Sequence, residues 1–199
     1  MPEFNLQNQL PPAENYQSGL LPQRNQINYW YRDTSSRSNL INNFQLSSEN
    51  RRILNKTQEF TFELISLKDF SFTPAVQKQI FSWVKQLNWE FPTSSIKNIF
   101  TRHIFNYLYI WKDSTGKVIA YSVCYFSDKI SHIAYVFYHP QYDHSNLPIR
   151  LVLQTVVDSH DKGLEYCYLG RFSPDTGFYK RNMPGFEYFK DGNWVTYKN

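Results

Sequence analysis

The chain has 199 residues, a length that suits about one domain. Its 21 lysines and arginines outnumber its 17 acidic residues, which gives a mildly basic protein with a net charge of +4 and an isoelectric point near 8.9. This balance is compatible with a nucleic acid partner without requiring one, because the basic residues are scattered along the chain.

Cysteine and histidine usage excludes several classes of protein. The two cysteines, Cys124 and Cys167, lie within predicted strands, and the five histidines lack the spacing typical of metal ligands. We therefore expect no disulfide framework and no metal site, and a reducing location such as the cytoplasm. No apolar run approaches about 18 residues, and the first 28 residues lack the apolar core of a signal peptide, so neither membrane insertion nor secretion is expected.

The N-terminal segment differs in composition from the rest of the chain. Residues 1–28 are rich in Asn, Gln and Pro without steady periodicity, which predicts an irregular arm that is ordered only if it docks elsewhere. Residues 29–199 are expected to form one domain, which opens with the aromatic patch Tyr29-Trp30-Tyr31. Ser47 and Ser48 are good N-cap residues and predict a short helix directly after them.

Two amphipathic helices are predicted after an alternating strand at 60–66. Thr73-Pro74 begins the first helix, because threonine caps well and proline suits the first helical position. The second helix covers residues 94–105 and carries His103 on its apolar stripe. We interpret His103 as a core residue with satisfied hydrogen bonds rather than as a catalyst.

The central part of the chain predicts an antiparallel meander followed by a long helix. Three strands, at 107–112, 117–126 and 131–139, are separated by short turns. The helix from Leu147 to Lys162 is apolar on most sides, and Gly163 is the expected residue just beyond its C-terminus.

A strand at 165–170 follows the long helix and breaks at Gly170, and a last strand or hairpin is expected at 186–197. Between them lies the basic aromatic stretch Phe178-Tyr179-Lys180-Arg181. Ring faces and cations in one loop at a strand end suit a polyanionic or nucleotide-bearing ligand. The alternative is an ordinary sheet edge whose aromatic residues belong to the core.

This order of elements resembles the acetyltransferase-like fold called GNAT. It predicts an α/β (α+β) protein with a mixed, mostly antiparallel, splayed sheet flanked by helices. In that fold the third strand of the meander separates from the strand after the long helix, and the ligand enters the resulting gap. The analogy concerns the fold and assigns no chemistry.

The loop before the long helix argues against coenzyme A. GNAT acetyltransferases hold its pyrophosphate there with a glycine-rich loop and the helix N-terminus. This chain has no glycine between Gly116 and Gly163, and Pro148 removes an N–H donor from the first turn. We therefore expect no cofactor. Arg150 lies close enough to the helix start to meet an anion, or it is an ordinary solvated residue.

Three stretches resemble the C-terminal domain of arginyl-tRNA–protein transferases, including their bacterial leucyl-transferring relatives. The first is Phe44–Arg52, similar to the family's Phe…Ser…Arg-Arg segment. The second runs from Gly116–Ala120 to Tyr135–Pro140, similar to its G-x-hydrophobic-A and Y-x-F-Y-x-P stretches. The third is the most specific, and it joins Gly163–Gly170 to Tyr179-Lys180, Pro184, Glu187 and Trp194, similar to the run GL-x-Y-x-YLG … YK … P-x-E … W.

The chain also departs from the family pattern. No cysteine precedes Cys124, whereas many members carry an N-terminal cysteine cluster that holds an iron–sulfur centre. The family's Ser-Leu-Gly-Thr opening of the long helix is replaced by Asn146–Ile149, and its aromatic residue after Tyr-Leu-Gly by Arg171. One extra residue separates Pro184 from Glu187. These changes predict a short, divergent member with a different aminoacyl group or acceptor.

The resemblance implies transfer of an amino acid, most simply arginine or leucine, from charged tRNA to the free α-amine of a protein or peptide. The ester is already activated, so the enzyme must align two reactants, accept a proton and stabilise an oxyanion, without a covalent nucleophile. The expected partners are an aminoacyl-tRNA and a protein or peptide N-terminus, and neither a membrane nor DNA is expected.

Ten residues are candidates for this site. We assign catalytic roles to Tyr168 and Glu187, since a carboxylate or a phenol could orient the amine. Residues that could bind the tRNA or substrate are Arg51, Arg52, Arg150, Arg171, Tyr179, Lys180, Arg181 and Trp194. Each has an alternative interpretation: Tyr168 and Trp194 as packing residues, Glu187 as the ion-pair partner of Lys180, and the paired arginines as a solvated helix face.

Two other functions remain open at this point. One is an acyl-CoA-dependent N-acyltransferase, against which the glycine-free loop counts. The other is a non-catalytic tRNA- or peptide-binding relative, which the altered helix opening favours.

Overall fold

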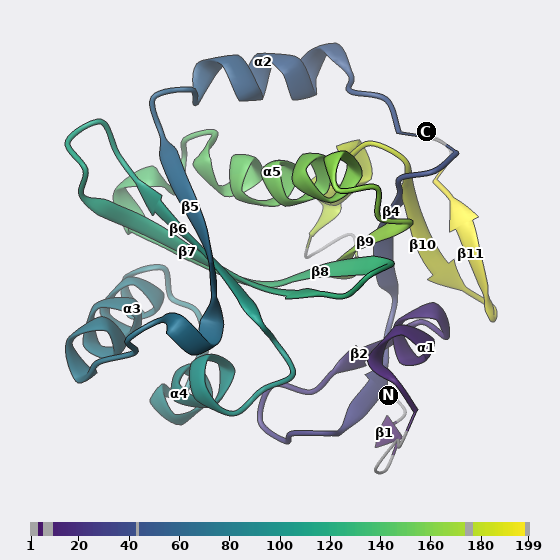
Figure 1. Ribbon diagram of the computed structural model, residues 1–199, viewed down its shortest axis with the longest axis horizontal. Coiled ribbons are helices and arrows are strands. Elements are labelled where there is room, and N and C mark those ends of the chain that lie inside the picture. Colours follow the sequence, from purple (N-terminus) through teal and green to yellow (C-terminus); the bar gives the residue numbers. More distant parts are fainter. Residues whose placement is uncertain (1–3, 6–9, 43, 174–176, 198–199) are drawn as a thin grey trace.

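An eight-stranded sheet organises the computed structural model, which describes residues 4–5, 10–42, 44–173 and 177–197 (Figure 1). Its strand order is β11-β10-β4-β9-β8-β7-β6-β5, and every neighbouring pair is antiparallel except β8 and β9. The strands are β4 (Ser35–Asn39), β5 (Thr61–Ser66), β6 (Tyr107–Lys112), β7 (Val118–Phe126), β8 (Ile130–Tyr138), β9 (Tyr166–Arg171), β10 (Phe186–Lys190) and β11 (Asn193–Thr196). The predicted mixed, mostly antiparallel sheet is confirmed.

Helices cover both faces of this sheet (Figure 1). Helices α2 (Ser48–Lys56) and α5 (Leu147–Asp161) lie on one face, and α3 (Pro74–Gln86) and α4 (Thr93–Thr101) lie on the other. Each pair buries its apolar stripe in a separate core cluster. No helix in the described ranges combines the length and apolar character needed to span a bilayer.

Local signals place the helix ends as the sequence predicts. The Ser47 hydroxyl accepts the Asn50 N–H at 3.0 Å and begins α2, and the Thr73 hydroxyl accepts the Val76 N–H at 3.3 Å and begins α3. Gly163 follows α5 with a φ of +73°, the left-handed conformation typical of a helix C-terminus.

Helix α4 is shorter than predicted, because it ends at Thr101. His103 therefore lies beyond the helix, where its Nδ1 accepts the Ile104 N–H and its Nε2 donates to the Gln23 carbonyl at 3.1 Å. The Ile104 N–H therefore bonds to the His103 side chain instead of to a helical carbonyl. Both ring nitrogen atoms of His103 are satisfied, as predicted, but the side chain is half-buried beyond the end of α4 instead of lying in the core.

The N-terminal arm was expected to be irregular unless it docks elsewhere, and its described residues do dock and form regular elements. Pro12–Gln17 form helix α1, and Leu20–Pro22 form β2 of a second, three-stranded sheet. Tyr16 is fully buried, with its ring centroid 5.0 Å from that of Trp30 and 4.8 Å from that of Tyr168. A helix of six residues is unstable alone, so this docking stabilises the arm.

The second sheet has the order β1-β3-β2, where β1 is Phe4–Asn5 and β3 is Trp30–Arg32. It lies against the main sheet beside β8 and β9, on the face opposite α5 (Figure 1). The remaining residues of the arm, 1–3 and 6–9, lie outside the described residues.

Strand β4 was not expected, because its sequence Ser-Ser-Arg-Ser-Asn is entirely polar. All five of its residues are nevertheless buried. The strand lies between β9 and β10 and pairs with both, so its backbone groups find partners on each side. Non-local pairing, not hydrophobic pattern, therefore places β4 in the sheet.

The sheet opens between β8 and β9, as predicted. The two strands run parallel, and their last paired residues are His132 and Tyr168. Directly beyond, Ala134 is an extra residue in β8 relative to β7, and Leu169 is an extra residue in β9 relative to β4. A β-bulge bends its strand and increases its twist, so two bulges at this level explain where the strands separate.

Candidate functional site

Four residues lie close together at the point where β8 and β9 separate, and we call this group the His132 gap: Tyr16, His132, Gly170 and Lys180. His132 is 4% exposed, and its Nδ1 lies 2.7 Å from the Tyr16 hydroxyl. Its Nε2 is buried and has no hydrogen-bond partner among the described residues. Burial, together with the nearby Lys180 and His103, lowers the pKa of His132 to about 3, so the ring is neutral at pH 7.

Glycine is required at the floor of this gap. Gly170 has a φ of +77°, and a Cβ built on it would lie 3.7 Å from His132 Nε2 and 3.8 Å from Lys180 Nζ. The positive φ is the conformation that favours glycine, and both nitrogen atoms border the position that a side chain would take. Two nitrogen donors beside one glycine are an arrangement that suits a ligand oxygen.

Lys180 enters the gap from the short helix η3 (Phe178–Asn182). Its Nζ donates to the Arg171 carbonyl at 2.8 Å, and burial lowers the pKa of the amine to about 8. A lysine in this position remains largely charged at pH 7 but gives up its proton more readily than a solvated lysine. It pairs with no carboxylate in the described part of the chain, so the suggested ion pair with Glu187 is not formed.

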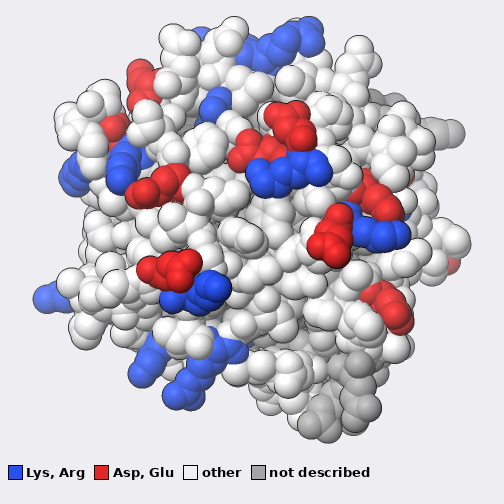
Figure 2. Space-filling view, in the orientation of Figure 1, with Lys and Arg blue, Asp and Glu red and all other residues white. Residues whose placement is uncertain are grey.

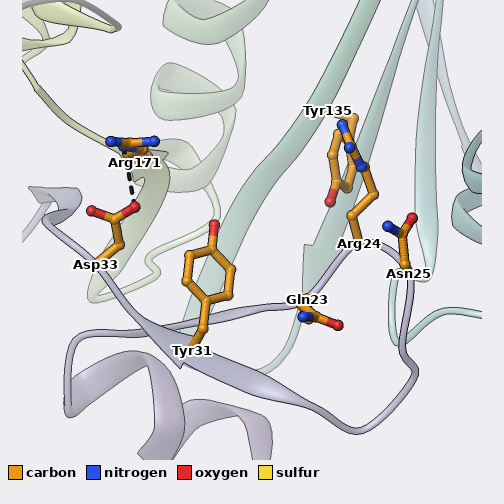
Figure 3. Close-up of a pocket in the computed structure, with 7 residues that line it drawn as sticks. All are labelled: Gln23, Arg24, Asn25, Tyr31, Asp33, Tyr135 and Arg171. Carbon is orange, nitrogen blue, oxygen red and sulfur yellow. Dashed lines mark ion pairs between the residues drawn. The ribbon is translucent and has the colours of Figure 1, made fainter. Parts of the chain in front are cut away.

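A pocket of about 380 Å³ lies beside the gap, between the arm and the diverging strands (Figure 3). Arg171 and Asp33 form an ion pair at 3.1 Å on one side of it, and Arg24 lies on the other. The hydroxyl groups of Tyr31 and Tyr135 point into the space between them (Figure 3). Two guanidinium groups and two phenols suit an anionic ligand with hydrogen-bond acceptors.

The residues predicted to be catalytic lie in a different, fully bonded cluster. We call it the Arg37 cluster: Arg37, Asn39, Tyr166, Tyr168, Glu187 and Trp194. The Glu187 carboxylate accepts from Arg37 Nε at 2.7 Å and from Asn39 Nδ2 at 3.0 Å.

Aromatic residues enclose the Arg37 guanidinium. It lies 3.8 Å from the Tyr166 ring centroid and 4.1 Å from the Trp194 ring centroid. Tyr168 is 1% exposed, and burial raises its pKa to about 12 although the adjacent Arg37 opposes the shift. These contacts give Tyr168 and Glu187 a packing role, and their catalytic assignment stays a prediction.

Trp194 also links the C-terminal hairpin to the arm, because its Nε1 donates to the Gln17 carbonyl at 2.8 Å. Both ends of its indole are therefore engaged within the protein. Trp194 is held as a packing residue in this arrangement, and its role as a stacking surface for tRNA bases stays a prediction.

Two of the predicted basic residues, Arg51 and Arg52, lie on helix α2. Arg52 forms an exposed ion pair with Glu49 and lies 3.4 Å from Asn146 Oδ1, while Arg51 donates to the Leu46 carbonyl. On the face drawn in Figure 2, basic and acidic side chains are interspersed rather than gathered into one basic patch. Arg51 and Arg52 remain exposed and available to a polyanion.

Arg150 is a structural link rather than a free cation. Its Nη1 donates to the Leu54 carbonyl at 3.2 Å and so joins α5 to α2, and burial lowers the pKa of its guanidinium. Together with the contact between Arg52 and Asn146, this bond places α2 along the start of α5. The region where GNAT acetyltransferases hold a pyrophosphate is therefore partly occupied by side chains from α2.

Tyr179 and Arg181 complete the predicted loop. Tyr179 is 36% exposed, yet desolvation of its phenol raises the pKa to about 12. The Arg181 guanidinium stacks 3.9 Å from the Phe178 ring centroid. Asn50 on α2 donates to the Asn182 carbonyl at 3.0 Å, so the two basic segments adjoin in space. Residues 174–176 of the same loop lie outside the described residues.

Sequence reasoning missed much of the site. His132, Tyr16, Arg24, Tyr31, Asp33, Tyr135 and Arg37 were not identified as site residues. Three of them, Tyr16, Arg24 and Arg37, come from the arm or from β4, where no periodic pattern indicated an ordered element. The only available signal for His132 was a histidine inside an apolar strand that was expected to border the splay.

The chain belongs to the family described as arginine-tRNA-protein transferase, C terminus, whose pattern matches residues 40–189. The matched part contains His132, Gly170 and Lys180 of the gap and Glu187 of the Arg37 cluster. Tyr16, Arg24 and Arg37 lie outside it. No curated protein matches this chain significantly.

Three solved structures share the fold. The C-terminal DUF2156 domain of a putative lysylphosphatidylglycerol synthetase from Agrobacterium fabrum has 15% identity and a TM-score of 0.52, covering 70% of this chain and 46% of that chain. A GCN5-related glucosamine N-acetyltransferase region of a fungal multi-domain GH3 β-N-acetylglucosaminidase has 13% identity and a TM-score of 0.50, covering 78% and 19%. A conserved protein of unknown function from Bacteroides thetaiotaomicron has 10% identity and a TM-score of 0.50, covering 85% and 60%.

These likenesses confirm the predicted GNAT-like fold. At such identities they concern the fold alone, and this chain spans less than two thirds of each of these longer chains.

Proposed function

We propose that this protein transfers an amino acid, arginine or leucine in the simplest case, from an aminoacyl-tRNA to the free α-amine of a protein or peptide in the cytoplasm. The observation that carries the proposal is the family match over residues 40–189, which includes His132, Gly170 and Lys180 of the His132 gap. Amine attack on an activated ester requires alignment and charge stabilisation, and the buried His132 with the adjoining Lys180 supports such a role.

The pocket beside the gap supports a nucleotide end as one reactant. Arg24 and Arg171 could meet phosphate or carboxylate groups, and the rings of Tyr31 and Tyr135 offer surfaces and hydroxyls to a base or ribose. The exposed Arg51 and Arg52 adjoin the loop that carries Lys180, so the tRNA could continue along α2.

An acyl-CoA donor is disfavoured by the same geometry. At the start of α5, Pro148 lacks an N–H group, and the Leu147 N–H donates to the Ser145 hydroxyl at 3.1 Å. These groups leave fewer free N–H donors for a pyrophosphate.

The test is transfer of radiolabelled amino acid from charged tRNA to a set of peptides that differ in their N-terminal residue. We expect label in peptides with a free α-amine and none in the same peptides after N-acetylation. Acylation of the peptides by acetyl-CoA, with no transfer from any charged tRNA, would contradict the proposal. Tight binding to tRNA without transfer would instead indicate a non-catalytic relative.

A further inference from the structure

The unpartnered Nε2 of His132 is the most informative atom in the molecule for mechanism. His132 is almost completely buried, and a buried polar atom without a partner among the described residues costs stability. Such an atom is expected where a ligand completes the bonding. Nε2 lies beside Gly170, so no side chain of that residue covers it on this side.

The contact with Tyr16 indicates which ring nitrogen carries the hydrogen. If the Tyr16 hydroxyl donates to Nδ1, the hydrogen lies on Nε2, and Nε2 is the one polar atom of this pair left without a partner. If Nδ1–H donated to Tyr16, both the buried hydroxyl hydrogen and the Nε2 lone pair would lack partners among the described residues. The first arrangement leaves one buried group unsatisfied instead of two, so it is the more stable.

Lys180 adds a second donor on the other side of the space. Its Nζ donates one hydrogen to the Arg171 carbonyl, and an ammonium group carries two further N–H donors, for which the described residues show no acceptor. Nε2 and Nζ both lie within 4 Å of the position that a Cβ on Gly170 would take, so no side chain of residue 170 separates them. Two neighbouring donors of this kind suit one oxygen atom with negative charge.

We propose that neutral His132, through Nε2–H, and the Lys180 ammonium hold the ester carbonyl oxygen of the aminoacyl-tRNA and stabilise the oxyanion of the tetrahedral intermediate. This inference rests on the proposed function. The amine nitrogen bonds to the carbonyl carbon, the bond from that carbon to the ribose oxygen breaks, and the proton lost by the amine ends on the ribose oxygen. Tyr16 is a positioning residue, because it acts on the substrate only through the tautomer of His132.

The charge state of His132 agrees with a donor rather than a base. Burial and the neighbouring cation keep the pKa near 3, so the ring has little tendency to accept a proton at pH 7. A neutral imidazole also donates this hydrogen bond without adding a second positive charge to the buried site.

A pair of substitutions tests the donor. His132→Gln retains an amide N–H near the position of Nε2, whereas His132→Asn places its amide near Nδ1. We expect His132→Asn to lower kcat for amino acid transfer by about 100-fold to 1,000-fold with little change in KM, and His132→Gln to lower it by about tenfold. His160→Asn, at an exposed histidine in the last turn of α5, is the matched control and should retain full activity.

A second measurement keeps the test independent of activity. Long-range ¹H–¹⁵N NMR of histidine-labelled protein should show the Nε2–H tautomer of His132 at pH 7, and Tyr16→Phe should convert it to a mixture. Equal kcat for the Asn and Gln variants in folded protein, or an Nδ1–H tautomer in the wild type, would overturn the inference and leave the proposed function standing. Absence of any transfer by the wild type would remove the proposed function and this inference with it.

Discussion

The Arg37 cluster and the His132 gap are both buried beside β9, but they treat their polar atoms in opposite ways. In the Arg37 cluster the Glu187 carboxylate has two donors, and the guanidinium is enclosed by the Tyr166 and Trp194 rings. In the gap, His132 Nε2 has no partner in the described part of the chain. Tyr16 touches both regions, through the rings of Tyr168 and His132.

This difference distinguishes buried polar groups whose bonds are completed within the protein from a buried polar group that a ligand would complete. A buried pair whose bonds are complete stabilises the fold only while both partners are present. A buried group that lacks a partner destabilises the fold and is retained when a ligand uses it. The contrast therefore predicts that substitutions in the first region mainly change stability and those in the second mainly change activity.

The largest expected effect is on stability, from Glu187→Ala. The substitution leaves the Arg37 guanidinium buried without its carboxylate, and the side chains are only 8% and 11% exposed. We expect the free energy of unfolding to fall by about 3–5 kcal/mol, as for other broken buried pairs, when measured by urea denaturation.

The matched control is Glu63→Ala, which breaks the exposed pair with Lys112, whose side chains are 50% and 37% exposed. Its cost should stay below about 1 kcal/mol. Equal costs at the two sites would show that the Arg37 cluster is not the structural clamp described above.

The second effect is the pH dependence of stability that arises from His132. Its pKa is lowered to about 3 in the folded protein by burial, Lys180 and His103, against about 6.5 in the unfolded chain. Between these values the unfolded chain binds the extra proton, so folding stability falls with decreasing pH by about 1.4 kcal/mol per unit. Lys180 stays charged across this window and Tyr16 stays neutral.

Urea denaturation of the wild type and His132→Gln at pH 7, 6 and 5 measures this slope. The variant should lose stability less steeply than the wild type as the pH falls, because glutamine does not titrate. His103, whose pKa is also lowered by burial, contributes equally to both proteins. Parallel curves would mean that His132 is protonated in the folded protein.

The third effect compares two glycines with the same backbone conformation. Gly170 and Gly163 have φ values of +77° and +73°, so alanine should cost each about 1 kcal/mol of stability. Only at Gly170 would the added methyl group meet His132 and Lys180; at Gly163 it would meet nothing within 4 Å. We expect Gly170→Ala alone to reduce kcat/KM for transfer, by about 100-fold.

Similar losses of activity in both glycine variants would indicate that they act through stability. Full activity in Gly170→Ala, with the expected loss of stability, would show that the gap does not receive the substrate.

Elements with local signals were predictable from the sequence. The caps at Ser47 and Thr73, the glycine after α5 and the order of the meander placed the helices and the splay correctly, because each depends on residues adjacent in the chain. Strand β4 and the arm were not, since they are stabilised by contacts with β9, β10 and Tyr168 that are distant in sequence. Local polarity indicated loops at both places.

The same reason explains which site residues were found. The family pattern pointed to Tyr168, Lys180 and Glu187, but their partners Arg37 and Tyr16 lie in the segments without a recognisable pattern. Without Arg37, the carboxylate of Glu187 looked available for catalysis. A charged residue can be assigned to structure or to chemistry only when its partner is known.

The smallest expected effect concerns how tRNA binding depends on salt, and it compares an exposed cation with a half-buried one. The Arg52 side chain is 42% exposed on α2, whereas Lys180 Nζ is bonded to the Arg171 carbonyl inside the gap. Each phosphate contact contributes about 0.7–0.9 to the slope of log affinity against log salt. Arg52→Ala should therefore reduce the slope of tRNA binding by about that amount, while Lys180→Met leaves the slope nearly unchanged and lowers kcat. The reverse result, a reduced slope with Lys180→Met only, would place Lys180 on the phosphate backbone and remove it from the oxyanion site, because one ammonium cannot serve both positions at once.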